Sequence, residues 1–190
     1  MKNTQIKNLT LAAMFLALGL VLPFFTGQIP QVGKMLLPMH IPVLLCGLIC
    51  GWQYGLATGF ILPLLRYLLF GMPVLFPTGI AMAFELAAYG FVIGWMYGHS
   101  KWKCVIALYR SLLAAMLAGR VVWGAVNVLL MGFGSHAFGW KMFLTGGFLT
   151  AIPGILLQLI LIPAVMIALN KTGLVPFSST EKTKPLTDVS

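Results

Sequence analysis

The sequence predicts an all-α integral membrane protein with six transmembrane helices and with both termini in the cytoplasm. Of its 190 residues, 60% are hydrophobic and 8% are charged, whereas a soluble domain carries about 25% charged residues. The apolar residues form runs, several of them near the length of about 20 residues that a helix needs to cross a bilayer. Most lysines lie between or outside these runs, at the ends that one side of a membrane would share.

The apolar runs are residues 8–27, 39–52, 55–70, 79–98, 105–131 and 142–169. The first follows the basic start MKNTQIK, as a signal peptide does, but no small-residue cleavage motif comes after it, so we interpret it as a membrane helix. The second and third are short and are separated by CGWQYG. They form either one long hairpin or two segments that reach only part-way across. We expect a single six-helix domain over residues 1–170 and a polar cytoplasmic tail over 171–190.

The basic residues predict the orientation. With six crossings, one side of the membrane receives Lys2, Lys7, Lys101, Lys103, Lys171, Lys182 and Lys184, with Arg110 close to it. The other side receives only Lys34 and Lys141. By the positive-inside rule, the termini are cytoplasmic and the protein is a multi-pass protein of the cell membrane. The net charge of +9 is scattered singly, without the basic face that would indicate a nucleic-acid partner.

This orientation turns three segments rich in Pro and Gly outward, residues 28–39, 71–79 and 132–141. Segments of this kind either cap a binding site from the outer side or merely connect helices, and the sequence leaves both alternatives open.

Polar residues inside the apolar runs are the candidate functional residues. They are His40, Arg66, Glu85, Arg120, Asn127 and Gln158. A charge at the bilayer centre costs about 2.5–3.5 kcal/mol on insertion scales, and such residues usually face a bundle interior or a cavity. Counting along each helix at about 1.5 Å per residue places the first five in the outer half of the membrane and Gln158 deeper. Separate helices therefore bring polar groups to a similar depth.

We expect Glu85 to balance Arg66 or Arg120 in a cavity that opens to the outer face. Two arginines against one carboxylate leave one positive charge, which a ligand carboxylate would neutralise through the planar fork of an arginine. The predicted substrate-binding residues are His40, Arg66, Glu85, Arg120 and Asn127. In the alternative, Glu85 and one arginine form an architectural pair and the other arginine extends to the interface. Asn127 and Gln158 would then bond helix to helix.

Small residues recur at four-residue spacing in three places: Gly51, Gly55 and Gly59; Gly90, Gly94 and Gly98; and Ala13 and Ala17. This spacing lets helices approach closely in lipid, either within the protein or against a partner subunit. Cys46 and Cys50 also lie four apart, but they provide too few ligands for a metal site, so we interpret them as packing residues. No disulfide framework is expected from three cysteines.

No enzyme motif is present: the chain lacks a P-loop, HExxH and GxSxG. We therefore expect no catalytic residues and no cofactor. A transport protein without a nucleotide site takes its energy from a partner or from an ion gradient.

Two stretches, MHIPVLLCGLICGWQYGLATGFILPLLRYLLFGMPVLFPTGIAMAFELAAYGFVIG (39–94) and LLAAMLAGRVVWGAVNVLL (112–130), resemble the substrate-binding S components of energy-coupling factor (ECF) transporters. The similarity spans most of residues 8–170, and the first stretch is most similar to the branch that holds pantothenate and pyridoxine transporters. The resemblance implies a vitamin-binding membrane subunit without ATPase activity. Its partners would be a transmembrane coupling subunit (EcfT-like) and two cytoplasmic ATPases.

In that family an alanine-x-x-x-alanine motif in the first helix contacts the coupling subunit, and it corresponds here to Ala13 and Ala17. The segment after the first helix, here 28–39, caps the outer site. Metal-binding members depend on an N-terminal histidine that this chain lacks, so no metal is expected. The resemblance implies uptake of a vitamin or vitamin precursor, with pantothenate as the first choice, then pyridoxine or a cobalamin precursor. The competing hypothesis is a self-sufficient secondary carrier that uses Glu85 as its proton site.

Overall fold

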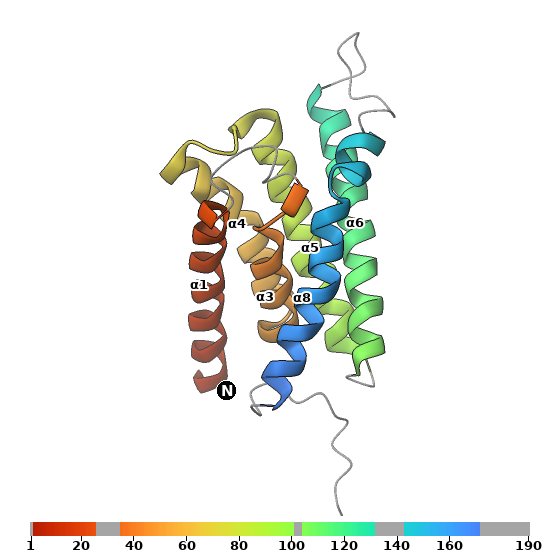
Figure 1. Cartoon of the computed structure of the whole chain (residues 1–190). Coiled ribbons are helices and arrows are strands. Elements are labelled where there is room, and N and C mark those ends of the chain that lie inside the picture. Colours follow the sequence, from red (N-terminus) through yellow and green to blue (C-terminus); the bar gives the residue numbers. More distant parts are fainter. Residues whose placement is uncertain (1, 26–34, 101–103, 132–142, 172–190) are drawn as a thin grey trace, which may run out of the picture.

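The computed structural model describes residues 2–25, 35–100, 104–131 and 143–171, and within these ranges it contains helices and no β-strand (Figure 1). The helices are α1 (Lys2–Phe25), α3 (His40–Cys50), α4 (Trp52–Phe70), α5 (Ile80–His99), α6 (Val105–Met131) and α8 (Ile152–Lys171). Two short π-helical turns, η1 (Leu75–Gly79) and η2 (Thr145–Leu149), precede α5 and α8. The all-α class expected from the sequence is confirmed.

Four stretches in the described part of the chain are long and apolar enough to cross a bilayer: Thr4–Phe25, Leu75–His99, Val105–Met131 and Thr145–Lys171. α3 is apolar but has only 11 residues. α4 has 19 residues, but Gln53, Pro63 and Arg66 interrupt its apolar character. The protein is therefore a multi-pass membrane protein.

Most apolar runs become helices close to the expected bounds, and α6 has the bounds of its run. The last run differs, because residues 150 and 151 form a turn between η2 and α8. Pro153 then lies in the first turn of α8, where its missing N–H leaves no hydrogen bond unmade. At the other end of the chain, α1 begins at Lys2, so the polar start of the sequence is part of the first helix.

The short second and third runs form a hairpin. Gly51 alone connects α3 to α4, with a φ of 97°. This conformation is open to glycine at little cost and is strained for residues with a Cβ. Its N–H donates to the carbonyl of Gly47 at 3.2 Å and its carbonyl accepts from the N–H of Gly55 at 3.0 Å, which continues the hydrogen bonding across the turn.

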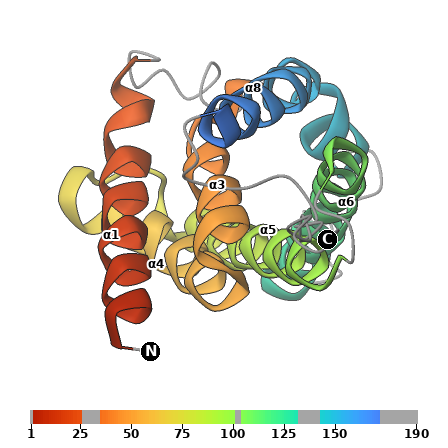
Figure 2. The ribbon, with the colours of Figure 1, turned by 90° about the horizontal axis from the view of Figure 1, so that it is seen from below.

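α5 is the central helix. It packs against α3, α4 and α6, while α8 packs against α3 and α6. Seen along the helices, α3, α5, α6 and α8 surround a common interior, and α1 lies to one side against α3 and α4 (Figure 2). In the most apolar 18 residues of each segment, half of the residues are buried for the segment that contains α5, whereas 22% are buried for α1. α1 is thus the peripheral helix.

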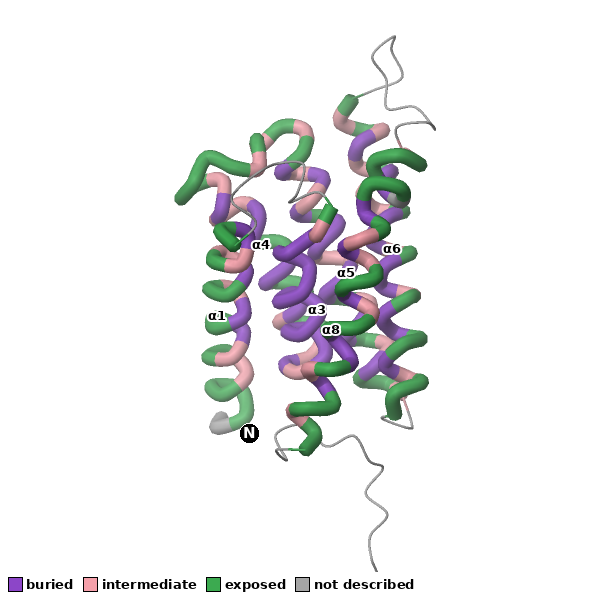
Figure 3. Tube along the Cα trace, viewed as in Figure 1, coloured by how far each residue is buried: buried purple, intermediate pink, exposed green. Residues whose placement is uncertain are grey.

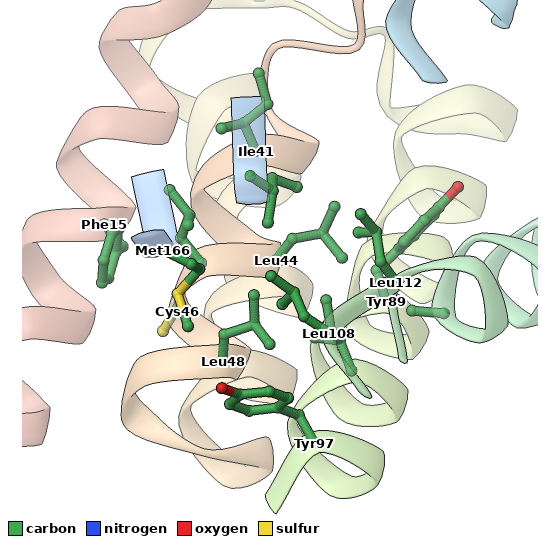
Figure 4. Close-up of a cluster of buried hydrophobic side chains, with 14 of the residues drawn as sticks. Phe15, Ile41, Leu44, Cys46, Leu48, Tyr89, Tyr97, Leu108, Leu112 and Met166 are labelled. Atoms are coloured by element: carbon green, nitrogen blue, oxygen red, sulfur yellow. The ribbon is translucent and has the colours of Figure 1, made fainter. Parts of the chain in front are cut away.

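α3 is the most enclosed helix, since every one of its residues except Ile49 is buried (Figure 3). A helix that is apolar on all sides is either buried in a protein or spans a membrane, and the 11 residues of α3 are too few to span one alone. Leu44 and Leu48 pack with Tyr89 of α5, Leu108 of α6 and Met166 of α8 (Figure 4). Because lipid is as apolar as these side chains, close van der Waals packing provides the cohesion of this core.

The glycine stripes serve internal packing. A Cβ added at Gly90 would overlap the backbone of Gly55, and one at Gly59 would overlap the backbone of Leu86. A Cβ at Gly94 would similarly meet the backbone of Trp52. α4 and α5 therefore contact each other backbone to backbone. Gly51 and Gly98 are different, because nothing lies within 4 Å of the places where their Cβ atoms would be.

Replacing Gly90 by alanine should destabilise the protein by about 1–3 kcal/mol, the usual cost of overpacking a tight contact. The neighbouring atoms are backbone atoms, which cannot move aside as a flexible side chain would. Thermal unfolding in detergent should show a lower midpoint for Gly90→Ala than for wild type. Gly98→Ala, on the same helix but with open space around it, is the matched control. Equal midpoints for both variants would contradict the tight α4–α5 contact.

Candidate functional site

The described helices bury an unusual set of polar side chains for a membrane protein. At most 5% of the surface of each is exposed: His40, Thr58, Arg66, Glu85, Ser111, Arg120, Asn127 and Gln158. A buried charge needs a partner of opposite charge and hydrogen bonds to its remaining polar atoms. The partners of each group therefore show whether the group is architectural or is left open for a ligand.

Glu85 pairs with Arg120. Its Oε1 lies 2.9 Å from Nη1 of Arg120, and 2% of Glu85 and 4% of Arg120 are exposed. The two residues come from α5 and α6, which pack against each other. Of the two alternatives that the sequence offered for Glu85, the structure selects Arg120.

His40 is the third member of this cluster. It begins α3, and its Nε2 lies 3.6 Å from Oε1 of Glu85. Its backbone N–H donates to the carbonyl of Leu37 at 3.1 Å. Leu37 is buried and has a positive φ of 49°, which is uncommon for a residue other than glycine. The chain before α3 thus turns tightly to place His40 in the interior.

Tyr89 completes the surroundings of His40. The two rings meet edge to face, with centroids 5.0 Å apart and an interplanar angle of 83°. The Tyr89 ring lies directly against Gly119 of α6, where a Cβ would overlap it. Sequence reasoning missed Tyr89, although it follows Glu85 by four residues and must share a face of α5 with it.

Several atoms of this cluster have no hydrogen-bond partner in the described structure: both ring nitrogens of His40, Nε and Nη2 of Arg120, and Oε1 of Glu85. Oε1 is close to Nη1 of Arg120, but their contact is an ion pair without hydrogen-bond geometry. An unpaired buried polar group costs about 1–3 kcal/mol, and more when it is charged. The open atoms belong to three helices, α3, α5 and α6, and lie around one ion pair.

Arg66 lies in different surroundings. Its Nη1 donates to the carbonyl of Leu20 in α1 at 3.0 Å, and its guanidinium lies 5.7 Å and 5.8 Å from the ring centroids of Phe24 and Phe70. It forms no ion pair with Glu85. The expected excess of one positive charge is therefore absent from the cluster, since Arg66 serves instead to hold α4 against α1.

The amides differ in their bonding. Nδ2 of Asn127 donates to the carbonyl of Trp123, one turn earlier in α6, at 2.8 Å. Nε2 of Gln158, on α8, has no hydrogen-bond partner among the described residues, although only 1% of Gln158 is exposed. Gln158 is a further open polar group of the interior, and Asn127 is bonded within its own helix.

The outer segments are only partly described. Residues 28–34 and 132–141, which form most of two of the expected caps, lie outside the described residues. Leu37 and Met39 are buried, and a Cβ at Gly154 of α8 would overlap the carbonyl of Met35. The end of segment 28–39 therefore packs closely on the start of α8.

Ala13 and Ala17 are both exposed on α1. They lie among the exposed side chains of Leu9, Met14 and Leu18, whereas Ala12 and Phe15 on the opposite side of the helix are buried. The alanine pair therefore faces away from the bundle. Of the cysteines, Cys46 is buried with its Sγ 3.4 Å from Oγ1 of Thr58. The described residues contain no cluster of three or more residues that could bind a metal ion.

A family model of the ECF transporter substrate-specific component matches residues 7–166. The chain belongs to this family. No curated protein and no solved structure matches the chain. The protein is therefore a membrane-embedded subunit of the kind that binds vitamin-type substrates for transport, and the family is one of transporter subunits rather than enzymes.

Proposed function

We propose that this ECF substrate-specific component binds a vitamin or vitamin precursor for uptake through a polar site formed by His40, Glu85 and Arg120. The observation that carries this proposal is the set of buried, unpaired polar atoms on α3, α5 and α6. In a protein that binds a small molecule, such atoms are the ones that a ligand pairs. Asn127 lies two turns further along α6 from Arg120, where it could contact the same ligand.

The topology we propose has six membrane crossings with both termini in the cytoplasm of a multi-pass cell-membrane protein. The distribution of lysines supports this orientation. α3 and α4 would be the two arms of the hairpin at Gly51, with α3 shielded from lipid by its neighbours. Glu85 near the start of α5, and His40 at the start of α3, then lie in the outer half, where an external substrate arrives.

The partners we propose are a transmembrane coupling subunit and two cytoplasmic ATPases, since the chain itself has no nucleotide-binding motif. Ala13 and Ala17 would form the contact with the coupling subunit. Their exposure on the peripheral helix supports this role, because small residues let the backbone of a second helix approach closely.

For the substrate, pantothenate remains the first candidate, followed by pyridoxine and a cobalamin precursor. The order rests on the similarity of residues 39–94 and on the carboxylate-binding chemistry of an arginine. With Arg66 engaged elsewhere, Arg120 is the arginine that would provide this chemistry. Arg66 would then affect the site through the position of α1.

The alternative of a proton-coupled carrier predicts a different behaviour. If the chain were self-sufficient, it would accumulate substrate in proteoliposomes under a proton gradient without any partner. We expect the isolated chain to bind a vitamin in a calorimetric panel and to show no gradient-driven accumulation. We also expect the coupling subunit and the ATPases to co-purify with it. Accumulation by the chain alone would refute the proposal in favour of the carrier.

A further inference from the structure

Arg120 presents one free edge. A guanidinium has two edges on which a planar ligand can be held by two parallel N–H donors. Nη1 is engaged with Glu85 at 2.9 Å, while Nε and Nη2, which together form the other edge, have no hydrogen-bond partner in the described structure. Glu85 therefore holds the arginine through Nη1, and the phenol of Tyr89 also reaches the guanidinium, while Nε and Nη2 keep no hydrogen-bond partner of good geometry and are open to a ligand.

The chemical complement of this edge is a carboxylate, whose two oxygens match the spacing of Nε and Nη2. Neighbouring residues limit the directions from which a ligand can reach this edge of Arg120. Tyr89 packs on Gly119, next to Arg120 in the chain, and Gly147 of η2 lies close enough that an added Cβ would be 4.0 Å from Cδ of Arg120. Arg120 is thus enclosed by α5 and η2 as well as by its own helix.

The charges of the cluster then determine whether a proton must bind together with such a ligand. Glu85 and Arg120 carry opposite charges, which balance each other. A ligand carboxylate would leave one net negative charge in the interior of a membrane protein, which is costly. A proton on His40 would remove this charge, because its Nε2 already lies 3.6 Å from Oε1 of Glu85.

No other titratable group among the described residues is placed to compensate the charge. Besides Glu85, α5 offers His40 only Tyr89, a phenol that is uncharged in the neutral range. The buried residues of α8 are Gly154, Gln158, Ile162, Pro163 and Met166, none of which titrates. Arg66 of α4 is bonded to Leu20, and Cys46 and Cys50 lie further along α3. The buried residues described for α1 are apolar.

We infer that the site binds a ligand carboxylate on Nε and Nη2 of Arg120 and takes up one proton from water, held by His40, as it does so. This inference rests on the proposed function as a substrate-binding subunit. In this arrangement Glu85 orients Arg120. Its negative charge, added to that of the ligand carboxylate, exceeds the single positive charge of Arg120, so a proton is needed to balance the site.

The test uses matched pairs of vitamins that differ only in the carboxylate: pantothenate with pantothenol, nicotinate with nicotinamide, and biotin with its amide. Titration calorimetry of the purified chain in buffers of different ionisation enthalpy counts the protons taken up on binding. We expect a carboxylate member to bind at least tenfold more tightly than its neutral partner. We expect it to take up about one proton, so that its affinity falls about tenfold per pH unit over the pH range in which that uptake is measured.

Two variants locate the proton. Glu85→Gln keeps an amide oxygen beside Arg120 but removes the negative charge, so binding of the carboxylate should no longer take up a proton. His40→Gln removes the proton acceptor, so proton uptake and the preference for the carboxylate over its neutral partner should both disappear. Uptake that persists in His40→Gln but not in Glu85→Gln would place the proton on Glu85 and overturn the assignment to His40.

The remaining outcomes separate this inference from the proposed function. If only neutral vitamins bind, the chain is still a substrate-binding subunit and the carboxylate inference is wrong. If a carboxylate binds without proton uptake, the charge argument is wrong. If no vitamin binds and no ATPases co-purify, both proposals are wrong.

Discussion

Replacing Arg120 by alanine should reduce the affinity for the transported vitamin by about 2–5 kcal/mol, roughly 30- to 4,000-fold. The substitution removes the two free donors, Nε and Nη2, and it also leaves Glu85 without the partner that lies 2.9 Å away. Both effects act on the same site. Titration of the purified variants with the wild-type substrate measures the loss directly.

A loss of affinity in Arg120→Ala could also arise from unfolding, so a second variant is needed. Arg120→Lys keeps a positive charge opposite Glu85 but lacks the planar two-donor edge. It should therefore retain most of the thermal stability and still lose most of the affinity. Wild-type affinity in Arg120→Lys would show that the positive charge alone, and not the planar pair of N–H donors, accounts for ligand binding.

Arg66→Ala is the matched control, because Arg66 is also a buried arginine in a membrane helix. Its contacts are the Leu20 carbonyl and the rings of Phe24 and Phe70, so its loss should lower stability by weakening the contact between α1 and α4. Its effect on affinity should be much smaller than that of Arg120→Ala. An equal loss of affinity in both variants would mean that the ligand reaches both arginines.

The choice between the two arginines illustrates what the sequence could predict. Depth along the helices follows from counting residues, and it correctly brought Glu85 and Arg120 to one level. Rotation about the helix axis does not follow from counting. Leu62 contacts Gly19 of α1, and Arg66, one turn further along α4, shares that face. The direction of Arg66 was therefore determined by which side of α4 meets α1, which only the packed structure reveals.

Turns were the other feature that the sequence left open. CGWQYG contains two glycines, either of which tolerates a positive φ, and the structure uses Gly51 rather than Gly55. Gly55 is needed elsewhere, because its backbone touches that of Gly90. The interruption between η2 and α8 was not predicted either, although Gly146, Gly147 and Pro153 lie beside it. Glycine and proline are local signals for such a break, and the length of the apolar run concealed them.

The glycine and alanine stripes have the same spacing in the sequence but different roles in the structure. Gly55, Gly59, Gly90 and Gly94 are covered by other helices of the same chain, whereas Ala13 and Ala17 are exposed. Spacing predicts that a close approach is possible, and it does not identify the helix that approaches. Exposure separates the two cases, which leaves the alanine pair on α1 as the candidate contact with a partner.

Replacing both Ala13 and Ala17 by leucine should abolish uptake by the complete transporter while leaving ligand affinity of the isolated chain within about twofold, a change of about 0.4 kcal/mol. Two leucine side chains on one face of α1 would hold a partner helix away from its backbone. The proposed binding site is separated from them, because its residues belong to α3, α5 and α6. Uptake into proteoliposomes containing the coupling subunit and the ATPases, together with calorimetry of the isolated chain, tests both halves of this prediction.

The chain contains a matched control in α8. Ala164 and Ala168 are also four residues apart and are also exposed. The double variant Ala164→Leu with Ala168→Leu makes the same chemical change on a different outer face, so it should leave uptake near the wild-type level. Loss of uptake in the α8 variant but not in the α1 variant would transfer the coupling contact to α8. Loss of uptake in both variants, with unchanged thermal stability of each isolated chain, would mean that the partner contacts both helices. A general effect of the added side chains would instead lower the thermal stability as well.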